Sequence, residues 1–239
     1  MKRIVVLLSA MLLVVITLCA CKGPMIITSN SMLALMADSG AGTEANPYII
    51  KDKVIDLKGT NSNAGIQLQY TTKYVILRNI TVLNGSLSKK NINENDRANC
   101  LGIFLQFVSN ATIENCHLEN NNMGMWLEGC QYINVKTNTV IDNVYRGIYL
   151  MDSSYCILDG NTVGSDNPEY DDNILLNTNY TKPESKCELN MVSNNDTETI
   201  RLQGDKTDYN YIWYNYWQDE DVPSTVTIGS ECGTHNDIK

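Results

Sequence analysis

The chain has 239 residues, of which 43% are hydrophobic and 19% charged, so it is long enough for one sizeable core and too apolar for a wholly disordered chain. Tyrosine is common, at 13 residues against 2 phenylalanines, and asparagine is frequent, which favours a fold with many turns over a bundle of long helices. The formal net charge of −9 makes nucleic acid and anionic lipid surfaces poor partners.

The N-terminus has the pattern of an export signal. Two basic residues precede an apolar run over residues 4–18, and the run ends in the sequence LCAC, of which Cys21 is the last residue. We expect residues 1–20 to be a lipoprotein signal peptide, because a small residue directly before the cysteine resembles a lipobox. Cys21 is then the lipidated residue of an extracytoplasmic, membrane-anchored protein. An ordinary secretory signal and an uncleaved anchor are the alternatives, and both also place the rest outside the cytoplasm.

Residues 21–45 are predicted to be a tether that can include a cap. A short helix over residues 32–37, between Ser31 and Gly40, would suit a cap over the open end of a repeat protein. The alternative is a disordered spacer.

The body of the chain repeats itself. Four segments begin with glycine and then alternate: GIQLQ at Gly65, GIFLQF at Gly102, GMWLEG at Gly124 and GIYLMD at Gly147. In each of the last three repeats, an aliphatic residue follows the glycine-led segment at the same spacing. The residue three positions further on is Cys116, Asn138 and Asn161 in turn. The period is about 22 residues, which indicates a solenoid.

Alternation over short segments predicts strands, and this period without helical stretches predicts an all-β, right-handed parallel β-helix of six to seven coils over residues 46–239. The turn asparagines should form a hydrogen-bonded ladder, and residues 86–99 should be an excursion from a regular coil. Leucine-rich repeats are the competitor, but their fixed leucine pattern is absent. The predicted inward residues are Ile103, Leu105, Met125, Leu127, Ile148 and Leu150.

Six cysteines follow Cys21, at positions 100, 116, 130, 156, 187 and 232. An even number in an exported protein suggests disulfides, while an anaerobic host could leave them reduced and buried.

The segment GTEANPYII at Gly42, the glycine-led coils with asparagine turns, and NYW at Asn215 together resemble the NosD-like right-handed β-helix proteins. These belong to a wider group of carbohydrate-binding and sugar-hydrolysis β-helix domains, and the resemblance covers roughly residues 42–217. It implies an exported β-helix. The family name comes from a periplasmic protein linked to copper-centre maturation of nitrous oxide reductase.

Copper handling is not expected for this chain. Only His117 and His235 are available as imidazole ligands. Met123, Met125 and Met151 are soft enough for copper(I), but Met125 lies at an inward position, and core methionines are far commoner than metal-binding ones. We therefore expect no resident cofactor, with calcium as the one cation to consider.

A predicted glycan platform lies on the glycine-led strands. The residue two after each glycine should face outward, which stacks Phe104, Trp126 and Tyr149 on successive rungs beside Gln106 and Glu128. The alternative is a ladder that only stabilises the sheet, or one that residues 86–99 cover.

Closely spaced carboxylates form a second candidate, a calcium site or an acid/base pair at Asp166, Glu169, Asp171 and Asp172. The Asp-Asp doublet resembles that of the polygalacturonases, but their other signatures are missing, and a solvated turn explains the same residues.

Two functions remain from the sequence. The first is noncatalytic binding of glycans or other cell-envelope components. The alternative is a carbohydrate-active enzyme, a polysaccharide lyase, glycoside hydrolase or epimerase, acting on acidic polysaccharide. We assign no catalytic residues, because the catalytic signatures of such enzymes are absent.

Changing Cys21 to Ser should remove the lipid-acceptor thiol and release the protein from the membrane fraction into the periplasm or medium. Fractionation followed by immunoblotting measures this. Unchanged membrane retention of the variant would contradict the lipobox.

Overall fold

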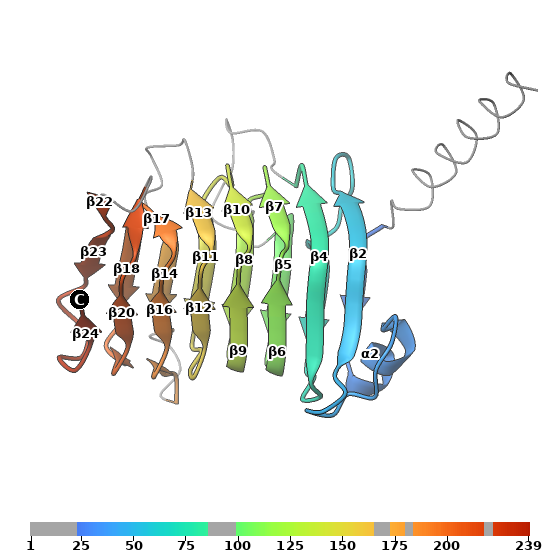
Figure 1. The fold of residues 1–239 in the computed structure, drawn as a ribbon, viewed down its shortest axis with the longest axis horizontal. Coiled ribbons are helices and arrows are strands. Elements are labelled where there is room, and N and C mark those ends of the chain that lie inside the picture. The colour runs from blue at the N-terminus through green and yellow to red at the C-terminus, as the bar shows by residue number, and fades with distance from the viewer. Residues whose placement is uncertain (1–22, 86–98, 165–172, 180–183, 218–221) are drawn as a thin grey trace, which may run out of the picture.

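A computed structural model of the chain describes residues 23–85, 99–164, 173–179, 184–217 and 222–239. The chain winds into a parallel β-helix, in which rungs stack in sequence order from the N-terminal end to the C-terminal end (Figure 1). This confirms the predicted fold class.

One face of the β-helix is an eight-stranded parallel sheet that contains the glycine-led segments. In spatial order its strands are β1 (Met25–Ile27), β3 (Ala64–Gln69), β5 (Leu101–Gln106), β8 (Met123–Glu128), β11 (Arg146–Met151), β14 (Ile174–Asn177), β18 (Thr199–Gln203) and β23 (Thr225–Ile228).

A 14-stranded sheet makes the other two faces, joined through the nine-residue strands β2 (Tyr48–Asp56) and β4 (Val75–Leu83). The first half of β4 pairs with β6 and its second half with β7. We call the face that contains the first half of β4 and β6 face two, and the face that contains the second half of β4 and β7 face three. Face two continues through β6 (Ser109–Glu114), β9 (Gln131–Lys136), β12 (Ile157–Asp159), β16 (Met191–Ser193), β20 (Tyr211–Trp213) and β24 (Asp237–Ile238). Face three continues through β7 (His117–Glu119), β10 (Thr139–Ile141), β13 (Thr162–Gly164), β17 (Asp196–Thr197), β21 (Tyr216–Trp217) and the antiparallel β22 (Val222–Pro223).

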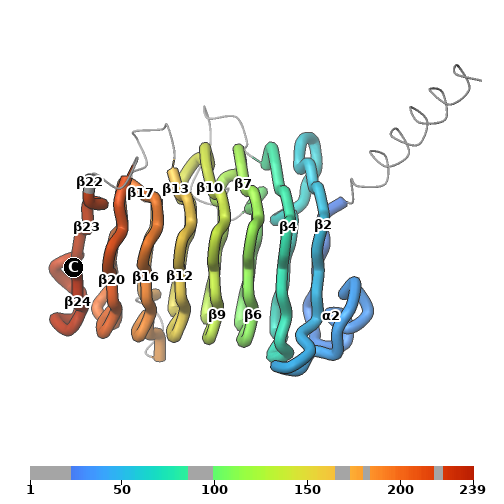
Figure 2. The backbone as a smooth tube through the Cα atoms, viewed as in Figure 1, coloured from blue at the N-terminus to red at the C-terminus, as the bar shows by residue number. Residues whose placement is uncertain are grey.

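A two-stranded sheet of β15 (Cys187–Glu188) and β19 (Thr207–Asp208) lies between the eight-stranded sheet and face two in the later rungs. The tube in Figure 2 shows how each rung of face two lies directly beside the next.

Alternation along the strands fills the interior. In register across β5, β8 and β11, the inward residues are the six predicted from sequence, and all six are fully buried: Ile103, Leu105, Met125, Leu127, Ile148 and Leu150. Burying each such side chain contributes about 1.5–3 kcal/mol relative to leaving it in water.

The glycines that lead the repeats are required by space. A Cβ atom at Gly124 would overlap the Val140 side chain from face three and would lie 2.7 Å from the carbonyl oxygen of Gly147 on the next rung. The eight-stranded sheet and face three therefore converge too closely at this corner for any side chain.

Buried asparagines tie the rungs together, as the sequence predicted. The Asn138 side-chain amide donates to Asn161 Oδ1, Asn161 to Asn195, and Asn195 to Asn215, each at 2.9 Å. A second ladder of Asn190, Asn210 and Asn236 follows the other end of face two. Both ladders satisfy buried backbone amides, which would otherwise cost about 1–3 kcal/mol each.

All six described cysteines are free thiols, so the disulfide prediction is wrong and the reduced alternative matches. Three of them stand at ladder positions, because the backbone N–H groups of Cys116, Cys130 and Cys156 donate to Asn138 Oδ1, Ser153 Oγ and Asn190 Oδ1 on the next rung. Burial raises the pKa of the Cys116, Cys156 and Cys187 thiols to about 12.

The N-terminal segment differs in part from the prediction. Residues 25–27, expected in the tether, form β1 and pair with β3, because three residues are too few to show alternation in the sequence. Helix α2 (Asn30–Met36) is present where a cap was considered, and it is N-capped by the Ser29 hydroxyl. Its Leu33 is fully buried in the core, so α2 covers the N-terminal end. After β1, the eight-stranded sheet has seven strands, which matches the six to seven coils expected over residues 46–239.

Replacing Val135, which is fully buried on β9, with Asp should lower the free energy of unfolding by several kcal/mol, because it places an unpaired carboxylate in the core. The matched control is Asn134→Asp on the adjacent exposed position of the same strand, which should change it by less than about 0.5 kcal/mol. Urea unfolding of the two variants measures this. Equal stability of both would contradict the alternation.

The interior thiols should resist alkylation in the folded protein. With a pKa of about 12, Cys156 and Cys187 carry only about one thiolate in ten thousand molecules at pH 8. Raising the pH increases this fraction. Maleimide labelling mapped by mass spectrometry should modify the partly exposed Cys232 first and the interior thiols only after denaturant is added. Rapid labelling of Cys156 in the folded protein would contradict this prediction, because it would show that the interior around Cys156 is accessible to the reagent.

Candidate functional site: an aromatic corner

The predicted platform exists as a stack but not as an exposed surface. The rings of Phe104 and Trp126 lie 5.3 Å apart and those of Trp126 and Tyr149 lie 5.7 Å apart. Tyr149, however, is only 6% exposed, and Phe104 and Trp126 are half-buried. The expectation of exposure is therefore wrong for Tyr149.

The reason is that an outward direction along a strand does not guarantee contact with solvent. Tyr149 packs in a second apolar cluster with Leu175 and with Val144 and Tyr145, which lie between β10 and β11. Its hydroxyl accepts a hydrogen bond from Asn177 Nδ2 at 3.2 Å, and burial raises its pKa. These contacts favour a structural role for this stack.

The polar partners predicted beside the platform bind each other. Gln69 Nε2 donates to Gln106 Oε1 at 2.6 Å, and Gln106 Nε2 donates to Glu128 Oε2 at 2.9 Å. They form a side-chain ladder across three rungs, at the C-terminal ends of β3, β5 and β8.

Two other predicted sites lie outside the described residues. These are the lipidation residue Cys21 and the acidic group Asp166, Glu169, Asp171 and Asp172.

The exposed aromatic residues instead gather on the corner between the eight-stranded sheet and face two. The strand registers place one residue of this corner on each of five successive rungs, which we call the tyrosine column: Tyr132, Tyr155, Leu189, Tyr209 and His235. Tyr132 and Tyr155 stack at 5.1 Å, and Tyr209 and His235 stack at 4.6 Å. With rungs about 4.8 Å apart, the column extends over about 19 Å.

The backbone at these tyrosines is unusual for the residue type. Tyr132, Tyr155 and Tyr209 have φ angles of 56°, 58° and 54°, in the left-handed region. That region costs an ordinary residue about 1–2 kcal/mol, and asparagine and glycine are the residues that tolerate it. Asn110 occupies the same column one rung earlier, so the fold accepts asparagine there. The tyrosines are therefore present despite the local backbone preference.

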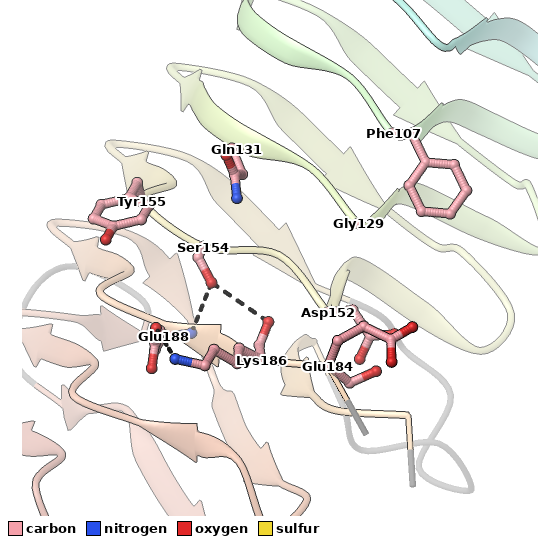
Figure 3. Close-up of a pocket in the computed structure, with 10 residues that line it drawn as sticks. Phe107, Gly129, Gln131, Asp152, Ser154, Tyr155, Glu184, Lys186 and Glu188 are labelled. Carbon is pink, nitrogen blue, oxygen red and sulfur yellow. Dashed lines mark hydrogen bonds and ion pairs between the residues drawn. The ribbon is translucent and has the colours of Figure 1, made fainter. Parts of the chain in front are cut away.

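A groove of about 530 Å³ adjoins the column. Tyr155 belongs to both, and Phe107 and Gly129 line the groove from the preceding rungs. Gly129 has φ 61°, and a Cβ atom there would lie 2.6 Å from the Phe107 ring, so the glycine leaves room for that ring. Figure 3 shows Tyr155 toward one side of the groove and Phe107 toward the other.

Polar side chains complete the lining. They are Gln131, Asp152, Ser154, Glu184, Ser185, Lys186 and Glu188.

Several of these polar groups already have partners. Lys186 Nζ lies 3.1 Å from Glu188 Oε1, and the Ser154 hydroxyl accepts from the Glu188 backbone N–H at 3.2 Å. Asp152 Oδ1 accepts from the Asn179 backbone N–H at 2.7 Å. Flat aromatic surfaces beside fixed hydrogen-bonding groups make an arrangement that can hold a ligand with apolar faces and polar edges.

Sequence reasoning missed this corner although a signal was present. Tyr132 and Tyr155 stand 23 residues apart and directly precede the inward residues Ile133 and Cys156. The repeated tyrosine before an inward residue could have marked the column. For a residue in the middle of a strand, the direction of the side chain is easier to predict from sequence than its exposure.

The fold and the corner together describe a parallel β-helix with an exposed aromatic surface along one corner. A family model described as "Periplasmic copper-binding protein (NosD)" matches residues 45–237, and the chain belongs to this family. No curated protein matches the sequence.

Among solved structures, the "Structure of the Streptococcus pneumoniae surface protein and adhesin PfbA" matches with 11% identity and a TM-score of 0.40, covering 85% of this chain and 73% of that one. The periplasmic family agrees with the extracytoplasmic location expected from the N-terminus. In the part of the chain that the structure describes, no helix is long and apolar enough to cross a membrane.

The described residues do not fit a copper site. They contain no group of three His, Cys, Asp or Glu side chains placed to hold a metal. His117 is paired with Glu119 and His235 with Asp208, while Met125 is fully buried in the core.

Proposed function

We propose that this protein is a noncatalytic binder of glycans on the cell envelope, and that the ligand lies along the tyrosine column and in the adjoining groove. The observation that carries the proposal is the set of exposed aromatic residues in left-handed backbone, where the same fold uses asparagine or glycine. Residues that are locally unfavourable cluster at functional sites.

The chemistry of a sugar ring suits this surface. Each ring has an apolar CH face and a rim of hydroxyl groups. The CH faces can pack on Tyr132, Tyr155 and Phe107, while Gln131 and Ser154 offer hydrogen bonds to the rim. Because the column extends over several rungs, it favours a chain of sugars over a single one.

Binding fits the groove better than catalysis. Glycoside cleavage uses two carboxylates in acid and base roles on either side of the scissile bond. Two of the three groove carboxylates already have structural partners, Glu188 in its ion pair and Asp152 in its backbone hydrogen bond.

The predicted anchor would give the site its orientation. Lipid at Cys21 would hold the chain just before β1, the first rung of the eight-stranded sheet. The later rungs, which carry the tyrosine column, would then lie away from the attachment point and be open to envelope polysaccharide.

A glycan array probed with the purified chain, followed by calorimetry on the ligands found, tests the proposal. A parallel assay for reducing-end and unsaturated products on the same polymers separates binding from cleavage. Binding without products supports the proposal, whereas product formation favours the enzyme alternative. No binding across the array contradicts both the tyrosine column and the groove as glycan sites.

Changing Tyr155 to Asn should weaken glycan binding by about tenfold, because one ring in a buried contact is worth about 1 kcal/mol or more. Stability should change little, since asparagine relieves the left-handed backbone while the stack with Tyr132 is lost. Calorimetry and thermal melting measure the two effects.

The matched control is Tyr214→Asn. Tyr214 is also exposed and has φ 54°, but it lies at the corner between faces two and three. It should leave binding unchanged. A sharp loss of melting temperature in Tyr155→Asn with binding intact would show that the column is structural.

A further inference from the structure

The charges of the groove are unbalanced. Among the described residues, three carboxylates line it, on Asp152, Glu184 and Glu188, against the single ammonium group of Lys186. That ammonium group already lies against Glu188. Among the described residues, no cation is paired with Asp152 or Glu184, and Figure 3 shows both carboxyl groups on the Phe107 side of the groove.

A buried hydroxyl in the same lining also lacks a partner. Ser185 is 5% exposed, and its Oγ makes no hydrogen bond in the structure. A buried polar atom without a partner costs about 1–3 kcal/mol, so its presence in a groove wall points to a ligand group that completes it.

We infer that the ligand is a glycan that carries positively charged amino groups, such as a polymer of amino sugars. This inference rests on the proposed function and names its ligand class. The aromatic rings of Phe107 and Tyr155 hold the sugar faces, and the carboxylates of Asp152 and Glu184 receive the ammonium groups.

The same charges select against acidic polysaccharide. A uronate carboxylate would enter beside Asp152 and Glu184, and the only ammonium group in the described lining is engaged by Glu188. The net charge of −9 adds long-range repulsion of anionic polymers. The acidic substrates considered for the enzyme alternative therefore suit this groove least.

The test compares three oligosaccharides of equal length by calorimetry at low salt and about pH 6, where a sugar amine is protonated. The probes are glucosamine oligomers, their N-acetylated counterparts and galacturonate oligomers. We expect the glucosamine oligomers to bind roughly tenfold tighter than the neutral ones, with this advantage lost at high salt, and the galacturonate oligomers to bind weakest.

Two substitutions and one control locate the effect. Asp152→Asn and Glu184→Gln should remove most of the preference for the charged oligomer over its N-acetylated counterpart. Asp142→Asn is the control. Like Asp152, Asp142 is an aspartate in left-handed backbone, with φ 54° against 52°, but it directly follows β10 on face three. It should change nothing.

The outcomes separate the two proposals. Equal binding of neutral and charged oligomers, or tightest binding of galacturonate, overturns the inference and leaves glycan binding standing. Loss of preference in Asp142→Asn but not in Asp152→Asn also overturns it. Failure of all three probes, together with a blank glycan array, overturns the proposed function itself.

Discussion

The backbone must turn at each corner of each rung, and at many corners it does so through a single residue in the left-handed region. Among the described residues, 18 non-glycine positions have positive φ, of which nine are Asn or Asp and six are Tyr or Phe. The amide and carboxylate residues tolerate this conformation. Aromatic residues have no such local advantage, and five of the six lie on the corner between the eight-stranded sheet and face two. The corner positions therefore fall into two kinds: Asn and Asp are explained by the backbone conformation, and the exposed aromatic residues by the surface that they form.

The interior could be predicted because period and alternation report directly on it. Gly124 marks a close approach to Val140, and Met125 and Leu127 point inward in the register expected. Periodicity says nothing about what covers the outer face. Tyr149 was therefore predicted to face outward correctly and to be exposed wrongly, since residues of another segment bury it. Strand β1 escaped prediction because three residues contain too little pattern.

Free thiols in an exported protein need a physical explanation, because such compartments favour disulfides. The interior cysteines substitute for asparagine or serine in the ladders, where a small polar group meets a backbone carbonyl: Cys130 Sγ lies 3.5 Å from the Leu105 oxygen, and Cys116 Sγ lies 3.8 Å from that of Leu77. Burial suppresses the reactive thiolate by raising the pKa of these groups. The same packing that holds the rungs together therefore protects the thiols, and no pairing is needed to keep them inert.

Within a rung, the residues that stabilise the fold differ from those that form the outer surface, so the surface can vary without loss of the fold. Stability comes from the inward residues and from ladders such as Asn190 to Asn210, which lie inside the β-helix. The tyrosine column projects from the outside of the same turns, one residue per rung. Because the rungs contact mainly their neighbours, a change at one column position affects a local stretch of surface and leaves the interior ladder intact. The asparagine already present in this column at Asn110 shows that the corner can lose its aromatic ring without losing the rung. A surface of this kind can therefore change its ligand through single outward substitutions, whereas the buried asparagines one residue away have no such freedom.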